Sequence, residues 1–557
     1  MFEENRRTKL FTLGAVCFGL FMVMLDNTVV NLALPTIQRE LSAGLTELQW
    51  IVDAFTLLLA ALMLTGGTVG DIYGRKRAFL TGLTIFTAAS LLCALSPTTE
   101  ILIAGRALQG LGAAIMMPNT LSILTNTFTD PKERAQAIGI WAGVSGISLA
   151  LGPALGGLMV DAWGWQSIFF INVPIGVIAF FIGFKLVLES KNPEGRSLDI
   201  IGQILAVTGL GTLTYAFIEA NSYGWGSATI ITLIVVGLAA LVAFGVWETR
   251  VKSPMLQLRF FRNMTFLGSN LVGLTVSFGF FGMIFFLGLF LQNVQGYSAV
   301  EAGVRMLAST LAVMVSAVVS GRIVGRIGAR VPVTVGMTLM GFCILGFTQV
   351  QTHTPYSSYW WLLTILGIGT GLVMSPITTA AMSTVPAARA GMASATLNTL
   401  RQVGGVFGIA VLGAIVTGRF VSEIRSALNA LDVPPLVTEK VVEIAREGRA
   451  AGGSGMPSIP GLDVNAIQEA VRVSFTTGMH RALWFAGVVV LAGAVIGAIM
   501  IRGTAPHEQL ARQAAAAETA GAGPTEGRPA VAHSGQDTIR PTPADAAAPV
   551  ADPELSE

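Results

Sequence analysis

Apolar runs of about 20 residues recur along most of this chain, and they constrain its fold more than any other feature. Each run is long enough to cross roughly 30 Å of hydrocarbon as an α-helix. Of the 557 residues, 53% are hydrophobic and only 12% are charged, whereas soluble domains carry about 25% charged residues. A water-soluble enzyme is therefore disfavoured, and the sequence predicts an all-α polytopic membrane protein.

The predicted spans number about fourteen when breaks are placed at Gly, Pro and clusters of charge. An even number places both termini on one side of the membrane. The first run is too long for the core of a signal peptide and has no small-residue cleavage site after it, so we expect a helix that stays in the protein. The predicted spans are 11–33, 48–70, 78–96, 101–125, 137–160, 167–188, 199–219, 227–248, 266–292, 303–321, 331–350, 359–383, 398–418 and 482–502.

The short loops carry their positive charge almost entirely on one face, which indicates orientation because Lys and Arg stay cytoplasmic. The opposite short loops offer only Arg39. We therefore expect both termini in the cytoplasm and the protein in the cell membrane. The residues on the positive face are Arg6, Arg7, Lys9, Arg75, Lys76, Arg77, Lys132, Arg134, Lys185, Lys191, Arg196, Arg250, Lys252, Arg259, Arg262, Arg322, Arg326, Arg330 and Arg389.

Several kinds of partner are disfavoured by composition. Lys and Arg number 34 against 32 Asp and Glu, so there is no basic field for nucleic acid. The three cysteines, Cys17, Cys93 and Cys343, lie in apolar runs without disulfide or metal spacing. No Walker loop and no His/Cys/Glu set with metal spacing is present, so we expect no metal and no cofactor, with an ion gradient as the energy source.

The predicted organisation places two segments outside the bilayer. Residues 419–480 are polar and predict an extracytoplasmic helical loop, with helices at 421–431, 436–448 and 463–474 and a Gly/Pro/Ser break at 451–460. Residues 510–557 have the composition of a disordered tail. The predicted domains are a cytoplasmic N-terminus (1–10), a six-helix bundle (11–190), two inserted helices with their linkers (191–265), a second six-helix bundle (266–502) and a cytoplasmic tail (503–557).

A weak internal repeat supports two similar halves. Gly67-x-x-x-Asp71-x-x-Gly74-Arg75-Lys76 follows the second span, and Gly321-x-x-x-Gly325-Arg326-x-Gly328-x-Arg330 follows the tenth. The sequence Ile115-Met-Met-Pro118 is matched by Val373-Met-Ser-Pro376. Parallel repeats of six helices are the build of rocker-switch secondary transporters.

Ionisable residues within spans need a partner or a function, because each costs roughly 2.5–3.5 kcal/mol to insert. Asp26 lies late in the first span, followed by polar Asn27 and Asn31. Facing a cavity, it could take up and release a proton as access changes sides. Alternatively, it caps or pairs locally near the outer interface.

Asp53 and Arg106 are the other ionisable candidates. Asp53 lies near the outer end of the second span and is either a proton or cation site or a structural interfacial carboxylate. Arg106, in the fourth span, is a permanent cation that could modulate the protonation of a carboxylate such as Asp26, or could form a purely structural bridge.

Glycine-rich segments indicate helix contacts that change. The segment Gly67–Arg77 combines close-approach glycines with Asp71 and three cations, which could latch two halves, although an ordinary positive-inside anchor is the simpler alternative. Gly146-x-x-x-x-x-Gly152-Pro153-x-x-Gly156-Gly157 predicts a kinked helix with a bare face.

Met and Phe side chains of the fourth and ninth spans suit promiscuous apolar ligands, although most such residues pack or face lipid. Candidates for the substrate cavity are Asn27, Asn31, Met116, Met117, Phe281 and Phe285.

Together these motifs resemble the major facilitator superfamily, and specifically its bacterial fourteen-span drug:proton antiporters, over residues 11–502. Gly67–Lys76 is similar to the signature between helices two and three of that family. Arg106 with Gln109-Gly110 is similar to its fourth-helix motif, and Gly152-Pro153-x-x-Gly156-Gly157 to its antiporter motif. Leu25–Pro35 and Phe169–Gly176 resemble the fourteen-helix subfamily in particular.

The resemblance implies a major facilitator fold of two six-helix bundles plus two inserted helices. It implies proton coupling by Asp26 and Arg106, a hinge at Gly152 and Pro153, and an outward-open state held by Asp71 with Arg134 and the start of the thirteenth span. This chain departs from the family pattern at three places, with Ile at position 72, Gln-Ser at 166–167 and Gly at 325.

The sequence thus predicts a proton-driven exporter of amphipathic, often cationic, drugs or dyes, in contact with membrane lipids and acting as a monomer. A dedicated exporter of a lipid or an endogenous antibiotic is the alternative within this class. A non-transporting sensor would not need intramembrane Asp and Arg, and a membrane enzyme would need a nucleophile–base pair or a metal set that the motifs do not supply.

Overall fold

The computed structural model describes residues 2–191, 197–251, 253–385, 390–431, 433–446 and 464–502. All of them belong to one unit, Met1–His507. The predicted tail, the break at 451–460, and Arg196, Lys252 and Arg389 lie outside the described residues.

Fourteen helices of the described chain are long and apolar enough to cross a membrane, which agrees with the predicted number, and every predicted span overlaps one of them. The helices are α1 (Phe2–Glu40), α2 (Leu45–Tyr73), α3 (Arg75–Ala94), α4 (Thr99–Thr127), α5 (Pro131–Trp163), α6 (Ser167–Phe170), α7 (Asn172–Leu186), α8 (Ile200–Tyr223), α9 (Ala228–Glu248), α10 (Met264–Leu289), α11 (Ala299–Ile327), α12 (Arg330–Gly346), α13 (Trp360–Met382), α14 (Ala390–Ala430), α15 (Pro435–Arg446) and α16 (Val464–Met500). The short α6 and α7 together form one span, and short irregular helical turns complete the described part: η1 (Leu258–Arg262), η2 (Phe290–Val294), η3 (Phe347–Gln349) and η4 (Tyr356–Ser358).

Polar residues at the loops set where the helices begin. The side chain of Asp130 accepts hydrogen bonds from the backbone N–H groups of Lys132 and Glu133, and Pro131 follows at the first helical position of α5. Ser298 and Glu301 form a reciprocal capping box at the start of α11. Gly74, with φ of +118°, makes the turn between α2 and α3 without the strain that a side chain would add.

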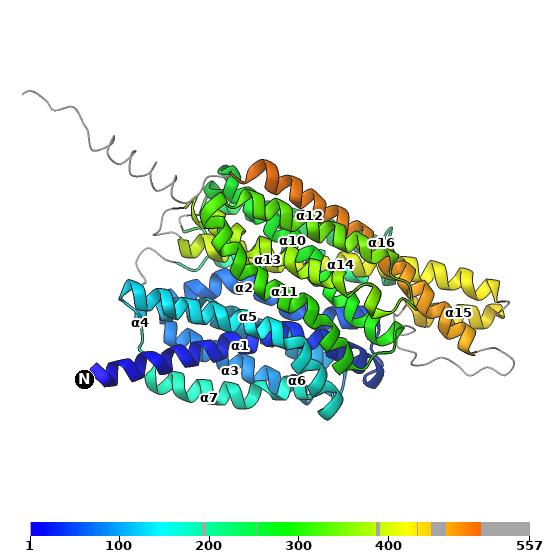
Figure 1. Cartoon of the computed structure of the whole chain (residues 1–557), viewed down its shortest axis with the longest axis horizontal. Helices are drawn as coiled ribbons and strands as arrows, with labels where there is room; N and C mark the ends of the chain where they lie inside the picture. Colours follow the sequence, from blue (N-terminus) through cyan, green and yellow to red (C-terminus); the bar gives the residue numbers. More distant parts are fainter. Residues whose placement is uncertain are drawn as a thin grey trace, which may run out of the picture. The chain divides into compact units, whose positions relative to one another are not determined.

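Successive spans run in alternate directions, so the loops lie on two faces. We call the face at which α1 begins and α16 ends the terminal face, and the opposite one, with loops 41–44 and 95–98, the distal face. In Figure 1 the chain starts at the left and α15 lies at the right, on the distal face.

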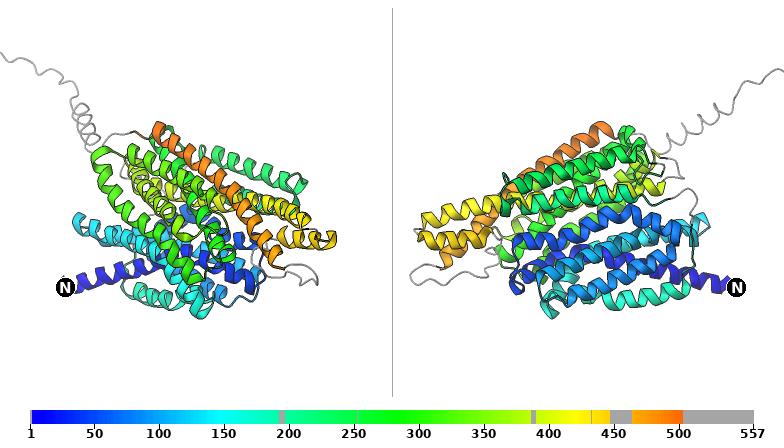
Figure 2. Two further views of the ribbon diagram at one scale, coloured as in Figure 1. Left: turned by 45° about the vertical axis from the view of Figure 1, so that its right-hand side comes forward. Right: turned by 180° about the vertical axis from the view of Figure 1, so that it is seen from behind.

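Helices α1–α7 pack mainly with one another, and so do α10–α14 and α16. In Figure 1 the first group, in blue to cyan, lies below the second, in green to orange. Figure 2 shows the same division from behind. The inserted helices α8 and α9 pack together, and α8 also contacts α2 of the first group and α14 of the second.

The predicted loop 419–480 differs from the structure at two of its three helices. Residues 421–430 continue α14, and residues 464–474 belong to α16, so only α15 is a separate helix. Both helices are longer than the roughly 20 residues that a bilayer requires. Their extensions bury apolar side chains against each other, with the rings of Phe420 and Phe475 6.0 Å apart. The predicted helix at 436–448 corresponds to α15.

Candidate functional site

A buried ion pair occupies the centre of the N-terminal half. One terminal nitrogen of Arg106, on α4, donates to Asp26 Oδ2 on α1, and both side chains are about 1% exposed. The Arg106 Nε donates to the backbone carbonyl of Ile51 on α2, at 2.9 Å. Arg106 therefore ties three helices together around the one carboxylate.

Gln109, one turn after Arg106, completes the network. Its Oε1 accepts from Arg106 at 2.9 Å, and its Nε2 donates to Asp26 Oδ1 at 3.3 Å and to the Ser90 hydroxyl of α3 at 2.7 Å. Both oxygens of Asp26 thus have donors. Sequence reasoning did not assign Gln109 this role, although its three-residue spacing from Arg106 places both on one helix face.

Two aromatic rings cover the guanidinium. The Arg106 Cζ lies 4.4 Å from the ring centre of Phe55 and 5.8 Å from that of Phe169. Cation–π attraction adds to the ion pair because both charged side chains are shielded from solvent. The pair is buried by protein, which is how an intramembrane charge is tolerated.

Asp53 presents the opposite situation. It is fully buried on α2, and neither of its carboxyl oxygens has a hydrogen-bond partner in the described part of the chain. Gln49, one turn earlier on the same face, donates to the carbonyl of Ile409 on α14 at 2.8 Å. Asp53 therefore lies on the face of α2 that meets the C-terminal half.

The predicted latch lies on the terminal face. The Asp71 Oδ1 accepts from the Arg75 Nε at 3.0 Å and from its terminal nitrogen at 2.9 Å. A Cβ at Gly67 would be in ordinary contact with Pro118 of α4, at 3.5 Å. Arg134 donates to two backbone carbonyls of its own loop, those of Phe128 and Thr129, at 2.9 and 3.0 Å.

Glu189 contacts the predicted latch segment, and sequence reasoning missed it. Its carboxylate accepts from the backbone N–H groups of Lys76 and Arg77, at 3.0 and 3.3 Å, and so caps α3. A Cβ at Gly74 would lie 2.7 Å from this carboxyl group, which explains the glycine. The Lys76 ammonium donates to the carbonyl of Phe184 at 2.8 Å. Glu189 lies 113 residues after Lys76 in the chain, so the motif itself gave no sequence signal for it.

The predicted hinge on α5 faces two neighbours. A Cβ at Gly152 would lie 1.8 Å from the Thr28 hydroxyl, and one at Gly156 would lie 2.9 Å from a methyl group of Val29, so both glycines let α1 approach. A Cβ at Gly157 would lie 2.3 Å from the carbonyl oxygen of Ala299 on α11. Gly146 is more open, with Met314 as its nearest neighbour at 3.9 Å.

Contacts between the two halves gather in their distal part. The Gln292 amide donates to the Leu32 carbonyl at 3.1 Å, and Asn293 donates to Gln38 at 2.8 Å. The Asp161 carboxylate accepts from the first backbone N–H groups of α11, those of Ala299 and Val300, at 3.2 and 3.0 Å. Sequence reasoning missed Asp161 because its partners lie in the other half of the chain.

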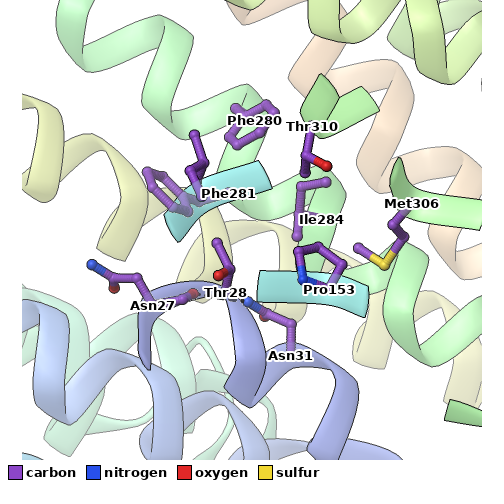
Figure 3. Close-up of a pocket in the computed structure, with 10 residues that line it drawn as sticks. Asn27, Thr28, Asn31, Pro153, Phe280, Phe281, Ile284, Met306 and Thr310 are labelled. Atoms are coloured by element: carbon purple, nitrogen blue, oxygen red, sulfur yellow. Dashed lines mark hydrogen bonds between the residues drawn. The ribbon is translucent and has the colours of Figure 1, made fainter. Parts of the chain in front are cut away.

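A narrow pocket lies between the halves, with about 320 Å³ of empty space including the part open to its surroundings. In Figure 3 Asn27, Thr28 and Asn31 of α1 lie opposite Phe280, Phe281 and Ile284 of α10. Its other lining residues are Leu149 and Pro153 of α5 and Met306 and Thr310 of α11.

The predicted cavity residues divide between pocket and packing. Asn27, Asn31 and Phe281 line the pocket, whereas Met116, Met117 and Phe285 are not among its lining residues. Met116 is fully buried where α4 meets α1 and α3, with its sulfur next to Gly19. The ring of Phe285 packs edge-on against Phe286 at 4.9 Å.

Comparisons with known proteins show which sequences this chain is similar to. The sequence model of the Major Facilitator Superfamily matches residues 16–409. The multidrug resistance protein Stp of Mycobacterium tuberculosis is 37% identical over 498 residues, covering 87% of this chain and 92% of Stp. The tetracenomycin C resistance and export protein of Streptomyces glaucescens is 34% identical over 516 residues, covering 92% and 95%.

Solved structures share the fold. A bacterial homologue of the human lysosomal transporter Spinster, in an inward-facing and occupied conformation, superposes with a TM-score of 0.60 at 18% identity, covering 88% of this chain and 96% of the homologue. At this identity the likeness supports the fold alone.

Proposed function

Because this chain belongs to the Major Facilitator Superfamily and is related over most of its length to drug efflux proteins, we propose that it exports amphipathic, often cationic, drugs or dyes in exchange for protons. The exchange proceeds by alternating access, with the cell membrane as its location and both termini in the cytoplasm. The proposed working unit is a monomer of two six-helix bundles, 11–190 and 266–502, with the inserted pair between them in sequence.

The observation that carries the proton coupling is the Asp26–Arg106 pair beside the pocket. Asp26 directly precedes Asn27, which lines the pocket. A movement of α1 that follows protonation of Asp26 would therefore also move a lining residue. Protonation would remove the charge that holds Arg106 and would weaken a charge-assisted hydrogen bond. The freed guanidinium would then favour a different packing of α1, α2 and α4.

Asp53 is the second proposed proton carrier. A carboxyl group without partners is tolerated in a dry site when it is neutral and is costly when it is charged. Its position on the α2 face toward α14 means that a shift of the halves would change its surroundings. Proton exchange between Asp26 and Asp53 would link protonation to the movement of the two halves.

The two groups of contacts on opposite faces provide the proposed gates. In the state seen here, the contact of Gly157 with α11 and the Asp161 cap join the halves at the distal face. The latch of Gly67, Asp71, Gly74, Arg75, Lys76 and Arg134 is the proposed counterpart at the terminal face. A two-state transporter needs such contacts to break in turn.

The proposed substrates follow from the pocket lining and from the relatives. Aromatic and thioether side chains at Phe280, Phe281 and Met306 suit apolar groups of varied shape, and Asn27 and Asn31 supply polar contacts. The energy is adequate, because one charge moved through 100 mV yields about 2.3 kcal/mol.

A second candidate function is the export of one dedicated antibiotic or metabolite. It is favoured by relatives whose names specify a single compound, tetracenomycin C in one case and methylenomycin A in another. Lipid export is a further form of the same proposal.

The test is ethidium movement in proteoliposomes with an imposed pH gradient. The parent should move ethidium against its gradient, and Asp26→Asn should abolish this. Retained transport in Asp26→Asn with loss in Asp53→Asn would move the coupling role to Asp53. An absence of ethidium movement in the parent, with transport of a single antibiotic, would favour the dedicated exporter.

A further inference from the structure

A second arginine lies deep within a span, and its surroundings differ from those of Arg106. Arg401 is on α14, 11 residues after Ala390, and so about 16 Å along the helix axis from its start. It forms no ion pair with any carboxylate of the described chain. Within the described chain its one side-chain hydrogen bond runs from a terminal nitrogen to the Asn398 Oδ1, at a long 3.4 Å, and its Nε is buried without a partner.

The contrast with Arg106 shows how incomplete this site is. Arg106 has a carboxylate, a backbone carbonyl, an amide oxygen and two aromatic faces. Arg401 has one amide oxygen that is at the limit of hydrogen bonding. A guanidinium presents five N–H donors and stays charged. Within a span it needs acceptors, and where the protein supplies no carboxylate a bound ligand can supply them.

Neighbouring contacts place Arg401 on the pocket side of α14. A Cβ at Gly273 of α10 would lie 3.2 Å from the Arg401 Cγ. One turn further along α14, a Cβ at Gly405 would lie 3.1 Å from the ring of Phe281. Phe281 lines the pocket in Figure 3. Arg401 and Phe281 thus mark one seam between α10 and α14.

The seam leads from the pocket toward the terminal face. Gly273 and Phe281 are eight residues apart on one face of α10, which is about 12 Å. Ser277 lies between them, buried, and its hydroxyl has no partner. Two donors without partners in the described chain, the Arg401 Nε and the Ser277 hydroxyl, therefore follow one another along the seam. The Arg401 side chain as a whole remains partly accessible.

We propose that Arg401 binds an acidic oxygen group, such as a carboxylate, phenolate or sulfonate, on the compound being transported. This inference rests on the proposed export function and extends its substrate class from cationic to anionic and zwitterionic amphiphiles. An acidic group supplies both the charge and the paired acceptors that the guanidinium lacks.

The test uses two fluorescent probes that differ in one group. Anilinonaphthalene sulfonate carries a sulfonate, and N-phenyl-naphthylamine has the same rings without it. Binding of each to the full chain is titrated in phosphatidylcholine nanodiscs. The ratio of the two dissociation constants measures the preference for the anion and cancels the contribution of the rings.

Arg401→Gln should reduce this preference about tenfold, the loss of one charge-assisted contact, while binding of the neutral probe stays the same. Arg322→Gln, which removes an exposed arginine of the same half, should leave the preference as in the parent. An unchanged ratio in Arg401→Gln, or an equal reduction in Arg322→Gln, would overturn the proposal.

Two further measurements test whether the effect comes from the Arg401 cation and from the added compound. Asn398→Leu removes the amide oxygen that accepts from Arg401 but keeps the cation, so it should preserve or raise the preference for the anion. A fall in that preference would count against the proposal even if Arg401→Gln fails to fold. Phosphatidylglycerol in the nanodisc supplies an anionic headgroup that can compete for Arg401. If it abolishes the part of the anion preference that depends on Arg401, a lipid headgroup is the ligand and the proposal fails. Because the readout is binding, failure of proton-coupled ethidium transport is a separate result.

Discussion

Asp26 and Asp53 are both buried carboxyl groups of the N-terminal half, but their surroundings predict opposite effects of the same substitution. Asp26→Asn leaves Arg106 buried without a counter-charge. Breaking a buried ion pair in this way costs about 3–5 kcal/mol. We expect a clear loss of stability against denaturant in detergent. A companion Asp26→Asn/Arg106→Gln variant should recover part of it, and no recovery would argue against the ion pair as the cause.

Asp53→Asn should behave differently, because no donor faces either carboxyl oxygen in the described chain. An amide of the same shape removes the cost of a buried charge or of its neutralisation. Stability should therefore be equal to or above that of the parent, while proton-driven transport is lost. A destabilisation as large as that of Asp26→Asn, measured in the same unfolding assay, would reveal a partner for Asp53.

At the residue scale the sequence predicted the polar types but only part of their partners. Asp26 and Arg106 stood out because charges are rare in apolar spans, and the structure places them together. Gln109, Asp161 and Glu189 were missed, since an amide or a surface carboxylate is common and its partner is set by tertiary packing. Met116 looked like a cavity residue from composition, but helix packing buries it.

At the scale of elements, the approach of α5 to α11 depends on glycine. Gly157→Val would place a side chain where the Ala299 carbonyl now lies, within 2.3 Å of a Cβ. We expect the two helices to separate at the distal face. Spin labels at positions 163 and 304, both exposed, should report a longer distance, and the native cysteines are buried and so should not react.

Gly143→Val is the matched control, because nothing lies within 4 Å of a Cβ at that position on the same helix. Its distance distribution should match that of the parent. If Gly143→Val lengthens the distance as Gly157→Val does, loss of helix rigidity rather than the α5–α11 contact would be responsible.

Asp161 adds an electrostatic part to the same contact. Its carboxylate faces the N-terminus of α11, where unpaired backbone N–H groups and the helix dipole favour negative charge. Asp161→Ala should disfavour the joined distal state by about 1 kcal/mol, or roughly fivefold in population. The same labelled pair measures this population, and an unchanged population would mean that the glycine contacts alone join the helices.

The spans themselves were predictable because hydropathy and loop charge act along the sequence, and all fourteen were located. The lengths of α14 and α16 were not predictable in this way. The polar residues after 418 suggested the end of a span, whereas the helix itself continues to Ala430. Phe420 and Phe475 hold these extensions together, and that pairing joins residues far apart in the chain.

At the scale of the whole molecule, the inserted helix α8 contacts both halves. The Gln203 amide donates to the Ala61 carbonyl of α2 at 2.9 Å, and Asn221 donates to the Ala414 carbonyl of α14 at 2.7 Å. Any movement of the halves must therefore slide along α8 or carry it. The repeat seen in sequence predicted two halves but gave no indication of this link.

The central claim is that export and proton movement are obligatorily linked, and the most direct measurement drives the exchange in reverse. Proteoliposomes containing the parent and an internal pH-sensitive dye receive an ethidium gradient and no pH gradient. Linkage predicts that ethidium entry drives protons out, so that the interior becomes alkaline, and that Asp26→Asn shows neither flux. Ethidium entry through the parent without a pH change would contradict proton antiport.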